Sequence, residues 1–151
     1  MIIVGIDPDS TAHGVAVYRD GELTELAELS LPQIRQWIAA LESTNNLIFS
    51  IENVLAQNFV YSRNALGKKA AHAKVALSVG RCQQAQAELM RELDFMGIAY
   101  EVHAPTGYNW AKNKDQFAKQ TGWKGSSNVE TRSAAFFGWV ALSARSRHAS
   151  K

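Results

Sequence analysis

Three acidic residues, far apart in the sequence, have the type and the placement that metal-ion chemistry requires. Asp7 follows the apolar run 2–6, Glu52 follows the apolar run 47–51, and Glu130 is the last acidic residue of the chain. A carboxylate among apolar neighbours is costly to desolvate unless hydrogen bonds or a cation offset that cost. Clustered carboxylate oxygens are the ligands of hard cations such as Mg²⁺ and Mn²⁺, whose charge relieves the repulsion between the acids.

The chemistry that such a cluster supports is phosphodiester hydrolysis. Two divalent ions, about 4 Å apart, can activate a water molecule and stabilise the leaving oxygen. We therefore expect Asp7, Glu52 and Glu130 to hold Mg²⁺, with Mn²⁺ as a substitute and two ions in each active site. The expectation depends on the strands that carry Asp7 and Glu52 being adjacent and parallel, so that both acids meet at one edge of a sheet.

Local structure offers a simpler role for two of these acids. Asp7 precedes the turn-forming residues 8–11, Pro-Asp-Ser-Thr, and its side chain could bond the backbone N–H groups of that turn. Residues 127–130, Ser-Asn-Val-Glu, match the S-x-x-E capping box, in which Glu130 would bond the backbone N–H of the cap residue. The sequence leaves both alternatives open.

A set of strands in the first third of the chain must position Asp7 and Glu52. β-branched residues and an Asp-Gly turn predict antiparallel strands over 2–7, 15–18 and 23–29. Apolar residues at helical spacing predict a helix over 31–41. The apolar run 47–51 predicts a buried fourth strand, which ends at Glu52.

The next part of the chain continues the alternation of helix and strand. Residues from about 68 to 96 predict a long helix with a break near Gly80, and Gly97 is a natural stop after it. Residues 98–102 predict a fifth strand. We expect loops and a short helix over 106–127.

The last helix and the order of elements complete the predicted fold. The helix is expected to begin at residue 127 or 128 and to fray over 145–148. Three antiparallel strands followed by β-α-β crossovers imply an α/β fold, a five-stranded mixed sheet with helices on both faces. At 151 residues, the chain is long enough for one domain with its own core, so residues 1–151 are expected to form a single domain.

Basic residues gather in two parts of the chain. Residues 1–101 contain 12 acids and 8 bases, whereas residues 102–151 contain 2 acids and 8 bases. Residues 53–87 contain five bases and no acid. Such stretches favour a polyanionic partner such as nucleic acid. No apolar run approaches the roughly 20 residues of a membrane helix. The first residues show no basic region and no cleavage site, so we do not expect export. The single Cys82 predicts buried packing in a reducing cytoplasm.

Taken together, the motifs resemble a known family of nucleases. Val-Gly-Ile-Asp-Pro at 4–8, Gly-Val-Ala at 14–16, the Ile-Glu strand end at 51–52 and the Ala-rich, carboxylate-bearing last helix resemble the RuvC-type Holliday-junction resolvases of the RNase H-like superfamily. The resemblance covers nearly the whole chain. It implies an RNase H-like fold, Asp7 and Glu52 as metal ligands, a homodimer, and Mg²⁺-dependent symmetric nicking of four-way DNA junctions.

Departures from the family pattern leave other functions open. Such resolvases usually begin the last helix with two acidic residues three positions apart, or with a histidine near one of them, whereas this chain has Glu130 and Ser133. A protein that lacks one ligand could bind branched DNA without cutting it efficiently. A sugar kinase or chaperone-type ATPase domain is a third possible function, because residues 5–7 and 10–11 resemble the phosphate loop of those proteins. That class needs a second glycine-rich loop and a much longer chain, and the sequence has neither.

Basic and aromatic residues near the predicted acid edge are candidates for DNA contact. Lysines at four positions are expected to contact phosphates, although each could be an ordinary solvated side chain. These are Lys68, Lys69, Lys112 and Lys114. Phe59 and Tyr61 could stack on unpaired bases at a junction centre, or could anchor their loop to the core.

Overall fold

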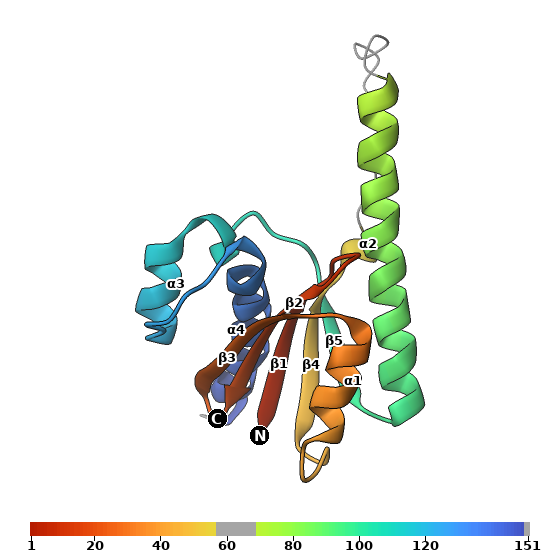
Figure 1. Ribbon diagram of the computed structural model, residues 1–151. Coiled ribbons are helices and arrows are strands. Elements are labelled where there is room, and N and C mark those ends of the chain that lie inside the picture. Colours follow the sequence, from red (N-terminus) through yellow and green to blue (C-terminus); the bar gives the residue numbers. More distant parts are fainter. Residues whose placement is uncertain (57–68, 150–151) are drawn as a thin grey trace.

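A five-stranded mixed sheet forms the centre of the computed structural model, which describes residues 1–56 and 69–149 (Figure 1). The strands are β1 (Ile2–Asp7), β2 (His13–Arg19), β3 (Glu22–Leu29), β4 (Leu47–Glu52) and β5 (Ala99–His103). Their order in the sheet is β3-β2-β1-β4-β5. The first three strands pair antiparallel, whereas β4 runs parallel to both β1 and β5. The predicted α/β fold is confirmed.

Helices cover both faces of this sheet. They are α1 (Leu31–Ala39), α2 (Lys69–Met96), α3 (Lys114–Thr121) and α4 (Val129–Ala149), with short 3₁₀ turns η1 (Val54–Ala56) and η3 (Trp110–Lys112). No helix in the described ranges is long and apolar enough to cross a membrane.

Two predictions about helix continuity are wrong. Helix α2 passes through Gly80 without a break, because one glycine costs a long helix only about 1 kcal/mol. Helix α4 does not fray at 145–148 but continues to Ala149. Arg145 stabilises its last turns by donating to the carboxylate of Glu101 in β5 at 3.2 and 3.3 Å.

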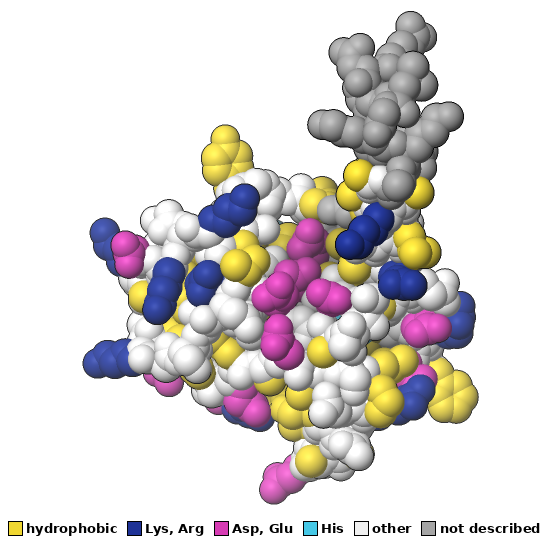
Figure 2. Space-filling view, turned by 45° about the horizontal axis from the view of Figure 1, so that its top comes forward, with side chains coloured by type: hydrophobic (Ala, Val, Ile, Leu, Met, Phe, Trp, Pro, Cys, Tyr) yellow, Lys and Arg dark blue, Asp and Glu magenta, His cyan; other side chains and the backbone are white. Residues whose placement is uncertain are grey.

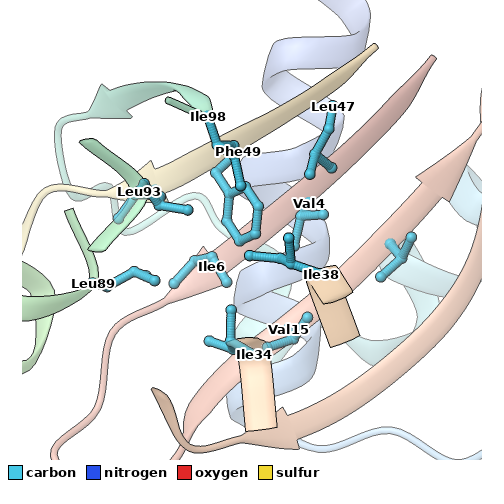
Figure 3. Close-up of a cluster of buried hydrophobic side chains, with 12 residues drawn as sticks. Val4, Ile6, Val15, Ile34, Ile38, Leu47, Phe49, Leu89, Leu93 and Ile98 are labelled. Carbon is cyan, nitrogen blue, oxygen red and sulfur yellow. The ribbon is translucent and has the colours of Figure 1, made fainter. Parts of the chain in front are cut away.

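One face of the sheet packs against α1 and the C-terminal half of α2 (Figure 3). Ile34 and Ile38 of α1 and Leu89 and Leu93 of α2 contact the buried side chains of β1, β2 and β4. The N-terminal half of α2 extends past the sheet (Figure 1). The side chains of Val75 and Leu77 are exposed there.

Helix α4 packs against the opposite face at unusually short range. A methyl group on Gly5 of β1 would overlap the carbonyl oxygen of Ala134, and a methyl group on Gly138 would lie 2.6 Å from the ring of Tyr18. Two buried hydroxyls reach across this contact: Tyr18 donates to the Ala135 carbonyl at 2.6 Å, and Ser50 donates to the Phe137 carbonyl at 2.7 Å. The position of α4 along the sheet is therefore closely defined.

Candidate active site

Asp7 and Glu52 lie side by side where two parallel strands end. Ile6 of β1 is in register with Ile51 of β4, so the next residue of each strand is an acid at the same edge of the sheet. The Asp7 side chain is partly buried, and Glu52 is only 8% exposed. The β1–β4 pairing therefore meets the condition under which the two acids were expected to come together.

Glu130, in the first turn of α4, approaches this edge beside β2, the strand that pairs with β1. Gly14 of β2 is the register partner of Asp7, and a methyl group on Gly14 would overlap the carbonyl oxygen of Glu130. The first turn of α4 thus rests on the strand beside Asp7. A residue with a side chain at position 14 would push Glu130 away from the acids.

The alternative in which Glu130 caps α4 is wrong. The cap of α4 is Asn128, whose Oδ1 accepts from the backbone N–H of Thr131 at 2.9 Å, while the Thr131 hydroxyl accepts from the backbone N–H of Asn128 at 2.9 Å. This reciprocal pair satisfies the N–H groups that a capping box serves. Within residues 1–56 and 69–149, the Glu130 side chain forms no hydrogen bond or ion pair, so it is available to a ligand.

The turn after β1 is held by Asp9, not by Asp7. The Oδ1 atom of Asp9 accepts from the Thr11 backbone N–H at 3.3 Å, and the Asp9 backbone N–H donates to Nδ1 of buried His13 at 3.2 Å. No hydrogen bond described for this turn uses the Asp7 carboxylate. The alternative in which Asp7 only forms the turn is therefore wrong.

The acids at this edge repel one another. Burial, followed by the negative charges of Glu52, Glu130 and Asp9, raises the pKa of Asp7 to about 7, although a hydrogen bond from Ser133 opposes the shift. Burial also raises the pKa of Glu52. Both acids therefore resist losing their protons unless a cation offsets their charge.

Ser133 lies between these two acids at the position where the family pattern led us to expect a further acid. It is buried on α4, and its hydroxyl donates to Oε2 of Glu52 at 3.4 Å. The same hydroxyl opposes the rise in the pKa of Asp7. Ser133 thus stabilises the carboxylate form of its neighbours without adding a negative charge.

The donor set at this edge suits a hard cation. Asp7, Glu52 and Glu130 offer carboxylate oxygens, which match the preference of Mg²⁺ and Mn²⁺. None of these acids forms an ion pair with Lys, Arg or His in the part of the chain that the structure describes. In the same ranges, no three or more His, Cys, Asp and Glu side chains are arranged closely enough to hold one ion.

Helix α2 supplies polar residues that the sequence analysis did not identify. Gln86 is fully buried, donates to Oδ1 of Asn53 at 3.0 Å and accepts from the backbone N–H of Leu55 at 3.1 Å. These bonds hold the chain as it leaves Glu52. The sequence contains one signal of this role: Gln86 is a polar residue on the same helical face as Leu89 and Leu93, which are buried.

Cys82 is also placed differently from the prediction. It is partly exposed rather than fully buried, and it lies close to the turn that follows Asp7. Burial raises the pKa of its thiol, the charges of Asp9 and Asp7 raise it further, and a hydrogen bond with the Ser10 backbone opposes the rise. The residue therefore belongs to the surroundings of the acid edge.

Basic side chains lie on both sides of the acidic group. Figure 2 shows acidic side chains together at the centre of one face, with lysine and arginine side chains on either side. Lys112 and Lys114 are exposed, in η3 and at the start of α3. The backbone of Lys69 begins α2, whereas its side chain lies outside the described residues, together with Phe59, Tyr61 and Lys68.

Comparison with known proteins identifies the fold. No protein-family model and no curated protein sequence matches the chain. Two solved structures of RuvC from Thermus thermophilus do match, each with 18% sequence identity and with 96% of both chains covered. One, a complex of that protein with a Holliday junction substrate, has a TM-score of 0.56, and the other has a TM-score of 0.52. The chain therefore has a RuvC-like fold.

Proposed function

We propose that this protein is a divalent-metal-dependent endonuclease that resolves four-way DNA junctions by paired symmetric nicks. The observation that carries the proposal is the pair of partly buried Asp7 and buried Glu52, which β1 and β4 hold at one edge without a neutralising cation from the described chain. The RuvC-like fold supports it, because one of the matching structures is a complex with a Holliday junction.

Asp7, Glu52 and Glu130 are the residues that would hold Mg²⁺ or Mn²⁺, with two ions in each site. When bound, the ions activate the attacking water and stabilise the leaving oxygen, giving a 5′-phosphate and a 3′-hydroxyl. Asp7 must give up its proton to act as a ligand, and the Ser133 hydroxyl favours that loss. Glu52 is largely shielded from water, which strengthens the attraction between its carboxylate and a cation.

The substrate in this proposal is branched DNA, held by the basic side chains beside the acids. Lys112 and Lys114 contact phosphates without reading base sequence. The protein acts as a homodimer, because two symmetric sites can nick opposite strands. The exposed apolar side chains of Val75 and Leu77, on the part of α2 that extends past the sheet, support association with a second copy. Sedimentation equilibrium of the intact chain tests the dimer.

A labelled four-way junction tests the nuclease directly. We expect Mg²⁺-dependent cleavage that EDTA abolishes and that Asp7→Asn and Glu52→Gln each reduce by about 100-fold, since each removes a charged ligand and even the loss of a partner behind a ligand costs about 10–100-fold. Asp20→Asn is the matched control, because Asp20 is exposed and pairs with the N-terminal amine. Cleavage that survives Asp7→Asn unchanged would contradict the proposal.

A second candidate is a junction-binding protein that does not cut DNA efficiently. Two observations favour it: Ser133 occupies a position where an acid was expected, and the described residues contain no complete group of metal ligands. Tight, salt-sensitive junction binding with no cleavage in Mg²⁺ or Mn²⁺ would support this candidate over the nuclease.

The Ser133→Asp substitution separates the two candidates. If a missing ligand limits the protein, Ser133→Asp should create or increase metal-dependent cleavage, whereas the uncharged Ser133→Asn variant should not. If the unchanged protein already cuts the junction well, the hydroxyl is sufficient and the nuclease proposal stands.

A further inference from the structure

A pocket of about 460 Å³ opens on the flank of the molecule formed by η3, α3 and α4. The pocket is lined by residues of the segment 107–113, by Gln116 and Gln120 of α3, and by Phe136 and Trp139 of α4. Arg132 of α4 holds η3 in place by donating to the carbonyl of Ala111 at 2.8 and 3.1 Å. The pocket is thus built from elements that are bonded to one another.

Aromatic rings make up the apolar part of this pocket. Trp110 is only 3% exposed, and its ring centre lies 5.3 Å from that of Trp139 and 5.5 Å from that of Phe136. Tyr108 lines the same pocket but is 91% exposed, so its ring packs against almost nothing in the described chain. The buried ring of Trp110, the partly buried rings of Phe136 and Trp139, and the exposed ring of Tyr108 suit a flat, aromatic ligand.

Amide side chains make up the polar part. Gln116 and Gln120 form no side-chain hydrogen bond with any residue in 1–56 or 69–149. An amide offers a donor and an acceptor side by side, which is the arrangement that pairs with the edge of a nucleobase. Lys112 adds a positive charge at the rim, where a phosphate could be bound.

From this combination of rings, free amides and one lysine, we infer that the pocket binds an unpaired nucleobase of a DNA strand. Tyr108 stacks on the base, the glutamine amides contact its edge, and Lys112 contacts the neighbouring phosphate. The inference rests on the proposed function only in naming the strand as DNA. None of the pocket residues belongs to the acid edge.

Helix α4 connects the pocket to the acid edge. Phe136 and Trp139 lie six and nine residues after Glu130, which corresponds to about 9 and 14 Å along the helix axis. A DNA strand rises about 3.4 Å per nucleotide in a duplex, so roughly three or four nucleotides would cover this distance along the helix axis. The same strand could therefore reach both places.

Fluorescence of a short single-stranded oligonucleotide that contains 2-aminopurine tests the pocket without requiring cleavage. We expect quenching of the base analogue on binding, and a loss of affinity of about tenfold in Tyr108→Ala, because each base stacked on an aromatic ring contributes strongly to binding. Tyr108→Phe keeps the ring and should bind like the unchanged protein. Phe95→Ala is the matched control, since Phe95 is 87% exposed on α2, outside the pocket.

The outcomes separate this inference from the proposed nuclease. If the unchanged protein and Tyr108→Ala bind equally and quench equally, the pocket does not bind the base, even if the junction is cleaved. If Tyr108→Ala loses quenching while Tyr108→Phe and Phe95→Ala keep it, base binding in the pocket is supported, even if no junction is cleaved. If free deoxynucleoside monophosphates bind as tightly as the oligonucleotide, the ligand is a free nucleotide and the inference of a strand is wrong.

Discussion

Asp7 is held in a position that opposes its own ionisation. Its carboxyl group is partly buried and lies near the negative charges of Glu52, Glu130 and Asp9, so its pKa rises to about 7. A hydrogen bond from Ser133 opposes only part of this rise. In an unfolded chain the same group titrates near 3.8. The folded protein therefore holds the Asp7 proton over a pH range in which the unfolded chain releases it, and stability falls as pH rises through that range.

Asp7→Asn should remove this loss of stability. Without divalent ions, the variant should melt several degrees above the unchanged protein at about pH 8, since each kcal/mol shifts the melting temperature of a chain of this size by about 3 °C. The difference should shrink as pH falls and should vanish only below about pH 3, where Asp7 is protonated in both the folded and the unfolded state. Differential scanning calorimetry across this range, in EDTA, measures it.

Asp20→Asn provides the comparison for this experiment. Asp20 is exposed and has a φ of 51°, a conformation that asparagine also accepts. Its variant should not show the difference that Asp7→Asn shows between about pH 4 and 8. A pH-independent effect of Asp7→Asn would mean that the Asp7 carboxyl is not in the environment described above.

At the scale of elements, the close packing of α4 on the sheet is what brings Glu130 to β2. Glycines at positions 5, 14 and 138 make this possible, because a methyl group on any of them would overlap or crowd an atom of the facing element. The atoms that a methyl group would meet at Gly5 and Gly14 belong to the backbone of α4, which cannot move without shifting the helix.

Gly5→Ala should therefore lower the free energy of unfolding by about 3 kcal/mol. Gly80→Ala is the matched substitution: Gly80 lies in the interior of α2, and an added methyl group there would meet no described atom within 4 Å beyond the neighbouring backbone of its own helix. That change should raise the free energy of unfolding by about 0.5–1 kcal/mol, since alanine favours a helix. Urea denaturation measures both changes. If both substitutions changed the free energy of unfolding in the same direction, the packing described for α4 would be contradicted.

The cap of α4 can be tested separately from the acid site. Asn128→Ala should lower the free energy of unfolding by about 1 kcal/mol, because the backbone N–H of Thr131 loses its acceptor. Glu130→Gln should cause no such loss, since Glu130 forms no bond with the cap. A larger loss in Glu130→Gln than in Asn128→Ala would restore the capping role to Glu130.

At the scale of the whole molecule, opposite charges are arranged side by side on one face. The acids gather at the centre, where β1 and β4 end, and basic side chains flank them (Figure 2). A DNA strand held by the flanking cations would pass over the acids, which repel phosphate unless cations are bound between them. Binding of DNA and binding of divalent ions should therefore support each other.

The salt dependence of junction binding tests whether the basic side chains beside the acids contact DNA phosphates. The logarithm of the binding constant should fall linearly with the logarithm of salt concentration, and Lys112→Ala and Lys114→Ala should each reduce the slope by about one. Arg91→Ala is the control, because Arg91 is exposed on the half of α2 that packs against the opposite face of the sheet. Fluorescence anisotropy over a salt series provides the slopes. A slope that changes only in the Arg91 variant would place the DNA on the other face.

Much of the fold was predictable from local patterns. β-branched runs and the Asp-Gly turn predicted β1, β2 and β3, and the helical spacing of Ile34 and Ile38 predicted α1. These patterns suffice because each reflects which side chains one element buries. The cap of α4 was not predictable in this way, because the segment contains two capping patterns one residue apart, and the sequence does not say which residue is the cap.

The sequence by itself determined the types of the acidic residues, their places at the ends of strands and the basic character of the second half of the chain. Only the tertiary structure decided that Asp7 and Glu52 are neighbours, that Glu130 is free to join them, and that distant rings and amides form a pocket. The physical reason is that these relations depend on strand pairing and on helix-to-sheet packing. Both are set by contacts between residues far apart in the chain, such as Gly14 with Glu130, and no local pattern records them.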